Sequence, residues 1–449
     1  MNSFSMRFVA SLLMIFLSSA GVAGFEKQLP KQAEWSLTVR DLGGTLNVNN
    51  GSGQAKLMGP GSLNKLFVAG FALAGKMRLD GRLSVDASGN LYLQGGGNAL
   101  LDKAGLVEVV DKLVNKGTGE VTGDIVVDDS MLDIKGLERT RRGSAYAPPG
   151  ALGLDLHTVA VTVKPGWPGE APPVEIEPPN KAVRIAVPAR TVKGAANTIK
   201  ITRLDDLAYK VTGNIGENGG MVSERFSLDD PALYAGGVLK SLLADKGVAV
   251  KGKIRKGKTP GEAVLLADLL PGPDKDEMLR KMNVHSLNVL ADNLFLKAGT
   301  DKFGVPGTRE KGVRVTGEFL KGLGLPMDEV EISDGSGLSG RNRVTADFMT
   351  KYLYQVSKKP WFERFKNTLP RPGREGTVKD IPFDDPRFRV KSGWLEDVYA
   401  LAGYGIDAVG REVAFTFIMN GPGVGLMPNS DQSGAEVLES IRTGTYAVN

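Results

Sequence analysis

The 449-residue chain contains no cysteine, and its only histidines are His157 and His285. The lack of cysteine excludes disulfide bonds, a thiol nucleophile and a thiolate-bound metal. Two histidines so far apart, without identifiable acidic partners, do not make a metal centre. His285 precedes Ser286, but neighbouring residues on a helix point about 100° apart, so they do not predict a Ser-His catalytic pair. We expect no metal and no cofactor.

A long hydrophobic run is also missing. The longest apolar run, residues 8–17, has about half of the roughly 20 residues that a membrane span needs. It follows Arg7 and leads to small residues that end in a Gly-Val-Ala sequence, a pattern typical of a secretory signal peptide. We therefore expect residues 1–24 to be a signal peptide. The mature protein should be periplasmic, either soluble or in peripheral contact with a membrane.

Charge of one sign is not concentrated in any tract. The chain has 56 Lys and Arg against 51 Asp and Glu, a formal net charge of +5, and both signs are mixed along its length. This distribution predicts a solvated surface and gives no support for nucleic-acid binding. A composition of 41% hydrophobic and 24% charged residues is ordinary for globular proteins, and the length predicts two or three domains.

The pattern of apolar residues changes along the chain. Glycine-rich turns separate short strand-like runs in the middle, whereas longer helical and strand-like periods occur before and after. A proline-dense stretch, residues 165–179, predicts a loop. We expect one helix to begin near Ser62 and three others to cover residues 230–246, 282–298 and 345–356. The expected strands are residues 35–40, 46–49, 91–93, 124–127 and 159–163, followed by an antiparallel meander of residues 389–395, 398–405 and 412–420.

Three short fragments far apart in the chain occur in an order that indicates a common site. They are Ser62-Leu63-Asn64-Lys65, Ser286-Leu287-Asn288 and Lys391-Ser392-Gly393. Each is weak alone, since a Ser-x-x-Lys is expected about once or twice by chance in such a chain and can be a plain helix start. Their order, and their expected positions on a helix start, a second helix and a strand, predict a penicillin-sensitive acyl-transfer site.

With their surroundings, these fragments resemble the D-Ala-D-Ala carboxypeptidase/endopeptidase family of penicillin-binding proteins, specifically the penicillin-binding protein 4 type, of low molecular mass and class C. The resemblance implies an α/β fold in which a serine β-lactamase/transpeptidase-like core has an antiparallel sheet flanked by helices, with two nested β-rich domains inserted. It covers nearly all of the mature chain and rests on residues 59–66, 91–97, 123–129, 282–291, 334–339 and 391–404.

The insertions set the expected domain boundaries. Residues 25–80 and 276–449 should form a discontinuous catalytic core. Residues 81–156 and 221–275 should form an inserted domain, and residues 157–220 a second β-rich domain nested within it.

The expected chemistry begins with Ser62 and Lys65. A serine hydroxyl is a weak nucleophile and needs a neighbouring base, and residues three apart on a helix share a face. Lys65 can act as that base only when neutral, which requires burial and a nearby cation, for which Lys391 is the candidate. The resemblance implies that Ser62 then attacks the carbonyl between two D-alanines and forms an acyl-enzyme.

The resemblance also implies the roles of the second fragment. Ser286 passes a proton towards the nitrogen of the departing D-alanine. Asn288 bonds the substrate amide and Lys65. Ser62, Lys65, Ser286 and Asn288 are thus the expected catalytic residues.

The third fragment is expected to bind the substrate. In the family pattern, Lys391 and Ser392 meet the terminal carboxylate, which suits a cation beside a hydroxyl. Backbone N–H groups of Ser62 and Trp394 hold the oxyanion, and an edge strand at Gly393 can pair with an extended peptide.

Three positions depart from the family pattern. Ser392 stands where threonine is usual, which keeps the hydroxyl, and Leu287 stands where a polar residue is common. Trp394 stands where a small or hydroxylated residue is common, and its indole could narrow or cover the pocket. An enzyme that is acylated but turns over slowly is therefore an open alternative.

Three functions remain open. The leading one is an exported serine D-Ala-D-Ala carboxypeptidase, with D,D-endopeptidase as a further activity, that acts on peptidoglycan stem peptides and is acylated by β-lactam antibiotics. The second is a slow or inactive homologue that binds or scaffolds the cell wall. The third is a β-lactamase, which the lack of a Glu-x-x-Leu-Asn motif disfavours.

Two other signals have plainer interpretations. Residues 335–340 match G-x-G-x-x-G, but no β-α-β unit surrounds them, so a loop bordering the acyl-transfer site is preferred to a dinucleotide site. Asp128-Asp129 ends an expected strand and indicates a turn. In the family, an acidic residue near this point helps to recognise an amino group on the stem peptide.

Overall fold

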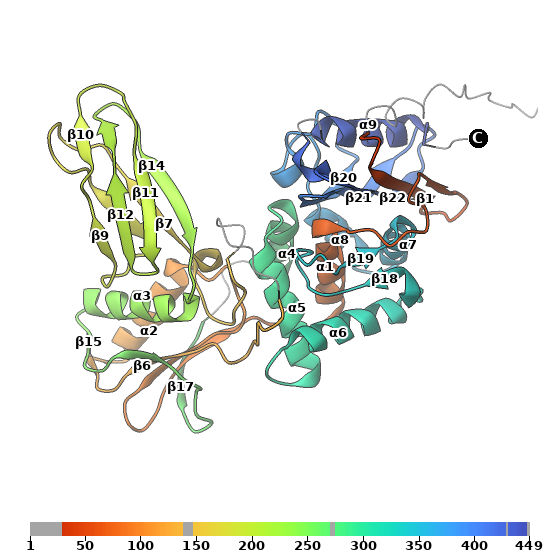
Figure 1. Cartoon of the computed structure of the whole chain (residues 1–449). Helices are drawn as coiled ribbons and strands as arrows, with labels where there is room; N and C mark the ends of the chain where they lie inside the picture. The colour runs from red at the N-terminus through yellow and green to blue at the C-terminus, as the bar shows by residue number, and fades with distance from the viewer. Residues whose placement is uncertain (1–28, 138–146, 270–273, 428–429, 447–449) are drawn as a thin grey trace, which may run out of the picture.

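The computed structural model describes residues 29–137, 147–269, 274–427 and 430–446 (Figure 1). The expected signal peptide, residues 1–24, lies outside these ranges. In the part of the chain that is described, no helix is long and apolar enough to cross a membrane. Figure 1 shows two bodies, one built from the beginning and end of the chain and the other from its middle.

The first body is built on an antiparallel five-stranded sheet in the order β2-β1-β22-β21-β20. The expected meander is confirmed, because β20 pairs with β21 and β21 with β22. The N-terminal strand β1 joins the other side of β22, with Leu37 opposite Phe417. Strand β20 is therefore an edge strand. The strands are β1 (Glu34–Asp41), β2 (Asn47–Asn50), β20 (Arg389–Leu395), β21 (Val398–Ile406) and β22 (Glu412–Asn420).

Helices cover both faces of this sheet because its strands are apolar on both sides. Ala400 and Ala402 of β21 pack in one core with α1 and α7, whereas Tyr399 and Leu401 pack in another with α9. Helix α1 is buried along nearly its whole length, as expected of a helix that is apolar all round. These helices are α1 (Asn64–Ala74), α7 (Ala346–Ser357), α8 (Phe362–Thr368) and α9 (Ser430–Thr443).

The prediction of a single helix over residues 282–298 is wrong. The chain forms α4 (Lys275–Val284) and α5 (Asn288–Phe303), and Ser286 between them has a φ of +54°. Apolar periodicity continues across the break, so the pattern could not reveal it. The left-handed residue turns the chain and creates a new helix start at Asn288. The rest of this body is α6 (Arg309–Gly322), β18 (Val330–Glu331), β19 (Arg343–Val344) and the 3-10 turns η2 (Gly61–Leu63), η5 (Met327–Glu329), η6 (Gly376–Val378) and η7 (Val424–Leu426).

The second body contains a mixed sheet in the order β16-β6-β4-β3-β17, which shares a core with α2 and α3. The expected helix over residues 230–246 is confirmed as α3, with Pro231 at its first position and Asp230 as its cap. Helix α2 was not predicted. The elements are β3 (Gly81–Val85), β4 (Leu91–Gln94), α2 (Lys103–Asn115), β5 (Glu120–Val121), β6 (Ile125–Asp128), α3 (Pro231–Asp245), β15 (Ala249–Val250), β16 (Ile254–Lys256) and β17 (Val264–Leu269).

A β-rich unit projects from this body (Figure 1). The loop expected over residues 165–179 contains an unexpected strand, β8, which pairs with β7 alone in the sheet β14-β7-β8. Flanking prolines are compatible with an edge strand, which explains the miss. The unit comprises η4 (Asp155–His157), β7 (Thr158–Val163), β8 (Val174–Glu177), β9 (Arg184–Ala186), β10 (Arg190–Val192), β11 (Lys200–Asp205), β12 (Ala208–Thr212), β13 (Asn214–Gly216) and β14 (Val222–Ser227).

Strand pairing shows how the middle of the chain is nested. Strand β3 pairs with β17, and β7 pairs with β14, so each excursion of the chain starts and ends on neighbouring antiparallel strands. We propose that the core is residues 25–80 and 276–449, the inserted domain residues 81–156 and 221–275, and the nested domain residues 157–220.

His157 closes a left-handed turn where the inserted region meets the core. Asp155, Leu156 and His157 have φ values of 48°, 59° and 60°. The ring of His157 is fully buried against Gly153, and its Nδ1 lies 2.7 Å from the Pro148 carbonyl oxygen. Burial lowers the pKa of His157 to about 4. The neutral imidazole is therefore part of the folded state.

We expect this histidine to make folding sensitive to acid. Its contribution is fully present above its ordinary pKa of 6.5 and is lost as the pH falls to about 4. The loss is about 3 kcal/mol, because the unfolded chain takes up a proton that the folded chain excludes. His157→Asn suits the positive φ and removes the titration. The melting temperature should drop less between pH 7 and pH 4.5 in this variant than in the wild-type protein. An equal drop in both proteins would contradict the expectation.

Candidate active site

The three sequence fragments lie side by side in the structure. Ser62 sits in η2, directly before α1, while Ser286 occupies the break before α5 and Asn288 begins that helix. Lys65 Nζ donates to Ser62 Oγ at 2.9 Å and to Asn288 Oδ1 at 2.7 Å. Lys391 Nζ, from edge strand β20, donates to Ser286 Oγ at 3.1 Å. Two amines and two hydroxyls thus face one another across three elements.

Lys65 has three oxygen partners and no exposed surface. Its third partner is the carbonyl oxygen of Ser336, at 2.6 Å. Burial lowers the pKa of Lys65 to about 8, against the opposing effect of Asp292 and Asp334. Burial, one of the two causes that were expected, is thus the leading cause of the lowered pKa. A neutral amine next to Ser62 is accessible near neutral pH.

Lys391 is buried in the same way. Its Nζ also donates to the Ser392 carbonyl oxygen at 2.7 Å. Burial, followed by the charge of Lys65, brings the pKa of Lys391 well below its usual range. Because the two amines disfavour each other's charge, a proton gained by one makes protonation of the other harder.

Glycines allow the backbone to close tightly around Ser62. A Cβ on Gly61, whose φ is +51°, would lie 2.9 Å from the Trp394 nitrogen, and one on Gly393 would lie 2.3 Å from the Pro60 carbonyl oxygen. The N–H of Gly59 and the side chain of Asn420 add a bond of 2.6 Å that holds this segment on β22. The backbone nitrogen of Trp394 is therefore held beside η2.

The indole of Trp394 points away from η2. Side chains alternate along a strand, and Gly393 faces η2, so Trp394 faces the other side of β20. Its ring centroid lies 6.3 Å from that of Tyr399, which packs with α9, and the indole is 50% exposed. The hydroxyls of Ser392 and Thr377 lie 2.8 Å apart.

Some residues of the site were missed in the sequence. Asp292 and Asp334 are buried beside Lys65, and Thr377 adds a hydroxyl from η6. A signal existed for Asp292, which follows Asn288 by one helical turn in an apolar helix. Thr377 has no local signal, because only the packing of η6 brings it to β20.

The glycine-rich segment at residues 335–340 is a loop bordering the site, as predicted. A Cβ on Gly337 would lie 1.9 Å from the Gly61 carbonyl oxygen, so the loop packs directly on the segment that leads into Ser62. Beyond it, a cavity of about 500 Å³ extends past the end of β20 and is lined in part by Leu338, Arg343 and Leu395.

Other candidate sites do not join this cluster. Asp128 accepts hydrogen bonds from Gln94, Ser130 and Thr259, and Asp129 pairs with Lys256, so both support the inserted region. His285 is exposed at the end of α4.

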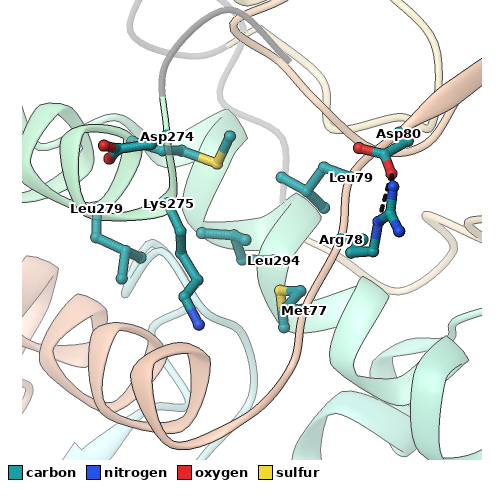
Figure 2. Close-up of a pocket in the computed structure, with 9 residues that line it drawn as sticks. Met77, Arg78, Leu79, Asp80, Asp274, Lys275, Leu279 and Leu294 are labelled. Atoms are coloured by element: carbon teal, nitrogen blue, oxygen red, sulfur yellow. Dashed lines mark hydrogen bonds and ion pairs between the residues drawn. The ribbon is translucent and has the colours of Figure 1, made fainter. Parts of the chain in front are cut away.

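A smaller pocket of about 130 Å³ lies where the chain leaves the core and returns (Figure 2). Figure 2 shows Lys275, Leu279 and Leu294 opposite the crossing segment that carries the Arg78–Asp80 ion pair. Lys275 Nζ donates to the carbonyl oxygens of Ala72 and Gly75. The pocket contains none of the motif residues.

The chain has relatives over most of its length. It is 29% identical over 362 residues to the D-alanyl-D-alanine carboxypeptidase of Actinomadura sp. (strain R39), a match covering 74% of this chain and 66% of that protein. It is 24% identical over 444 residues to the D-alanyl-D-alanine carboxypeptidase DacB of Haemophilus influenzae, covering 91% and 90%.

Solved structures confirm the fold. Penicillin binding protein 4 (dacB) from Haemophilus influenzae superposes with a TM-score of 0.75 and 23% identity, covering 93% of this chain and 98% of that one. The expected α/β architecture is thereby confirmed. A family model described as D-Ala-D-Ala carboxypeptidase 3 (S13) matches residues 19–440. Because that match spans nearly the whole sequence, the chain belongs to the D-Ala-D-Ala carboxypeptidase 3 (S13) family.

Proposed function

We propose that this D-Ala-D-Ala carboxypeptidase removes the terminal D-alanine of peptidoglycan stem peptides through an acyl-serine intermediate on Ser62. The observation that carries the proposal is the set of three bonds around Lys65 Nζ, to Ser62 Oγ, Asn288 Oδ1 and the Ser336 carbonyl oxygen. Two of these partners are carbonyl oxygens, which only accept hydrogen bonds. A neutral lysine must therefore give its two N–H groups to them.

That arrangement directs the lone pair of Lys65 towards Ser62. As Nζ takes the hydroxyl proton, Oγ attacks the carbonyl carbon of the penultimate D-alanine. The oxyanion is held by the backbone N–H groups of Ser62 and Trp394, which a packed glycine junction keeps close together.

Collapse of the intermediate requires a proton on the departing nitrogen. Ser286, bonded to Lys391 at 3.1 Å, delivers its hydroxyl proton to the D-alanine amine and receives in return the proton that Lys65 took from Ser62, so Lys65 is neutral again and can activate the water. The hydroxyls of Ser392 and Thr377 bind the terminal carboxylate, with Lys391 behind them. Water then attacks the acyl-serine, releasing the shortened peptide and restoring the Ser62 hydroxyl.

The edge position of β20 suits an extended substrate. Among the described strands, β20 has a sheet partner on one side only, so its free edge can pair with a peptide backbone. Gly393 lets the strand pack directly against the Pro60 carbonyl oxygen, which holds this edge beside η2. A stem peptide would thus lie along β20 with its carboxylate at Ser392.

Export and drug sensitivity complete the proposal. Residues 1–24 have the pattern of a signal peptide, which would place the enzyme in the periplasm with its peptidoglycan substrate. Penicillin binding protein 4 of Haemophilus influenzae has been crystallised with a β-lactam. A β-lactam would acylate Ser62 here by the same attack.

The proposed activity is tested by D-alanine release from a stem peptide ending in D-Ala-D-Ala, with a D-Ala-L-Ala peptide as control. We expect D-alanine release from the first peptide only. On addition of penicillin G, we expect the mass of the enzyme to increase by one adduct that outlasts many turnovers of the peptide. No release and no mass increase would indicate a scaffolding homologue. Rapid penicillin hydrolysis would indicate a β-lactamase.

Trp394→Ser tests whether the indole limits turnover. Because the ring contacts Tyr399 on the far side of β20 from η2, we expect kcat to change less than about threefold, the effect of under 1 kcal/mol. The measurement is steady-state D-alanine release at saturating peptide. A tenfold or larger rise in kcat would mean that the indole obstructs the site.

A further inference from the structure

Two buried carboxylates lie behind Lys65. Asp292, on α5, and Asp334, at the start of the glycine-rich loop, are each only 3% exposed. Asp292 Oδ1 accepts the N–H groups of Gly335 and Ser336 at 3.0 and 2.8 Å. Buried acids are costly unless their oxygens are bonded and their charge is balanced, so this pair requires an explanation.

The loop connects both acids to the base. Asp334 Oδ1 accepts the N–H of Gly337 at 2.6 Å, and the carbonyl of that same peptide group, on Ser336, accepts Lys65 Nζ at 2.6 Å. A carboxylate at the N–H end of a peptide polarises its carbonyl and strengthens the bond at the other end. Asp292 fixes the preceding peptide, and therefore the direction in which the Ser336 carbonyl points.

The charges of these groups are interdependent. The charges of Asp292 and Asp334 raise the pKa of Lys65, and so oppose the effect of burial. Asp292 has the larger effect of the two. Burial and Asp334 raise the pKa of Asp292 to about 7, while Lys65 opposes this rise. On β20, Lys391 is the other charged group facing Lys65. A proton bound in this cluster can therefore sit on Lys65, where it blocks catalysis, or on a carboxylate.

We propose that Asp292 is a positioning residue for acyl transfer: it aims the Ser336 carbonyl at Lys65, and its charge decides how readily Lys65 holds a proton. The inference rests on the proposed role of Lys65 as the base. Its consequence is that the acid limb of the pH–rate profile belongs to the Asp292–Lys65 pair and not to Lys65 alone. While Lys65 holds the proton it cannot act as the base, and loss of that proton activates it.

Asp292→Asn separates charge from shape. Asparagine keeps an Oδ1 that can accept both loop N–H groups but carries no charge. We expect the acid limb of Ser62 acylation by penicillin, measured as a second-order rate from pH 5 to 10, to move down by roughly one to three pH units. The matched control is Asp301→Asn, an exposed acid on the same helix, which should leave the limb unchanged.

The outcomes are distinct. A lower rate at every pH with the acid limb unmoved would overturn the inference, because a merely structural Asp292 predicts that result. If Asp292→Asn does not fold, Asp334→Asn removes the second charge and should move the acid limb in the same direction. An acid limb that stays in place in Asp334→Asn would also overturn the inference. Persistent acylation of Ser62→Ala would instead overturn the proposed function on which the inference rests.

Discussion

Ser62→Ala should abolish both D-alanine release and covalent labelling by a fluorescent penicillin. Removing a catalytic nucleophile costs roughly 10³- to 10⁶-fold in rate, because the acyl-enzyme can no longer form. The Ser62 hydroxyl is bonded to Lys65, and no helix cap depends on it. We therefore expect the melting temperature of the variant to stay close to that of the wild type.

Two comparisons make the Ser62 result decisive. Ser88→Ala, in an exposed turn of the inserted region, should keep full labelling and full D-alanine release. Labelling that persists in Ser62→Ala would place the nucleophile elsewhere. Loss of labelling together with a large fall in melting temperature would leave a folding defect as the cause, and circular dichroism of the same sample distinguishes the two.

Lys65→Met should lower the acylation rate by roughly 10² to 10⁴-fold, the usual contribution of a general base. Methionine has a similar length and no amine, so Ser62 keeps its hydroxyl but loses the group that accepts its proton. The oxygens of Asn288 and Ser336 each lose a partner, which costs about 1–3 kcal/mol, offset in part because a buried amine is removed as well. The rate is measured by stopped-flow with a chromogenic β-lactam.

Lys297→Met is the matched control for Lys65→Met. Lys297 is also a nearly buried lysine, but it lies on α5 and pairs with Asp301 instead of a motif residue. We expect it to acylate at close to the wild-type rate. Near-normal acylation by Lys65→Met would instead assign the role of base to the Ser286 and Lys391 pair.

The parts of the site that were predictable depend on local sequence patterns. Lys65 follows Ser62 by three residues at a helix start, and this spacing alone brings the amine to the hydroxyl. Lys391 lies on an expected strand, and the two strand-like runs that follow it indicate a meander, which the structure contains. Such features need no knowledge of distant segments.

The parts that were missed depend on tertiary contacts. Ser286 breaks a helix whose apolar pattern continues, and Gly376 packs so closely on this break that a Cβ there would lie 1.9 Å from the Val284 carbonyl oxygen. The link from Asp334 to Lys65 runs through one peptide group of a loop about 270 residues further along the chain. Burial of Lys65 likewise follows from the assembled core, so its pKa could be assigned to a cause only from the structure.

The central claim is that Ser62 forms the acyl-enzyme from which D-alanine has been released. The most direct measurement is mass spectrometry of peptides from the wild-type enzyme, quenched in acid during turnover of a D-Ala-D-Ala stem peptide. We predict a mass increase on the peptide that contains Ser62, equal to the stem peptide without its last D-alanine. Two results would contradict this account. One is D-alanine release with the adduct on another residue, and the other is D-alanine release with no adduct at a time resolution that captures the penicillin adduct.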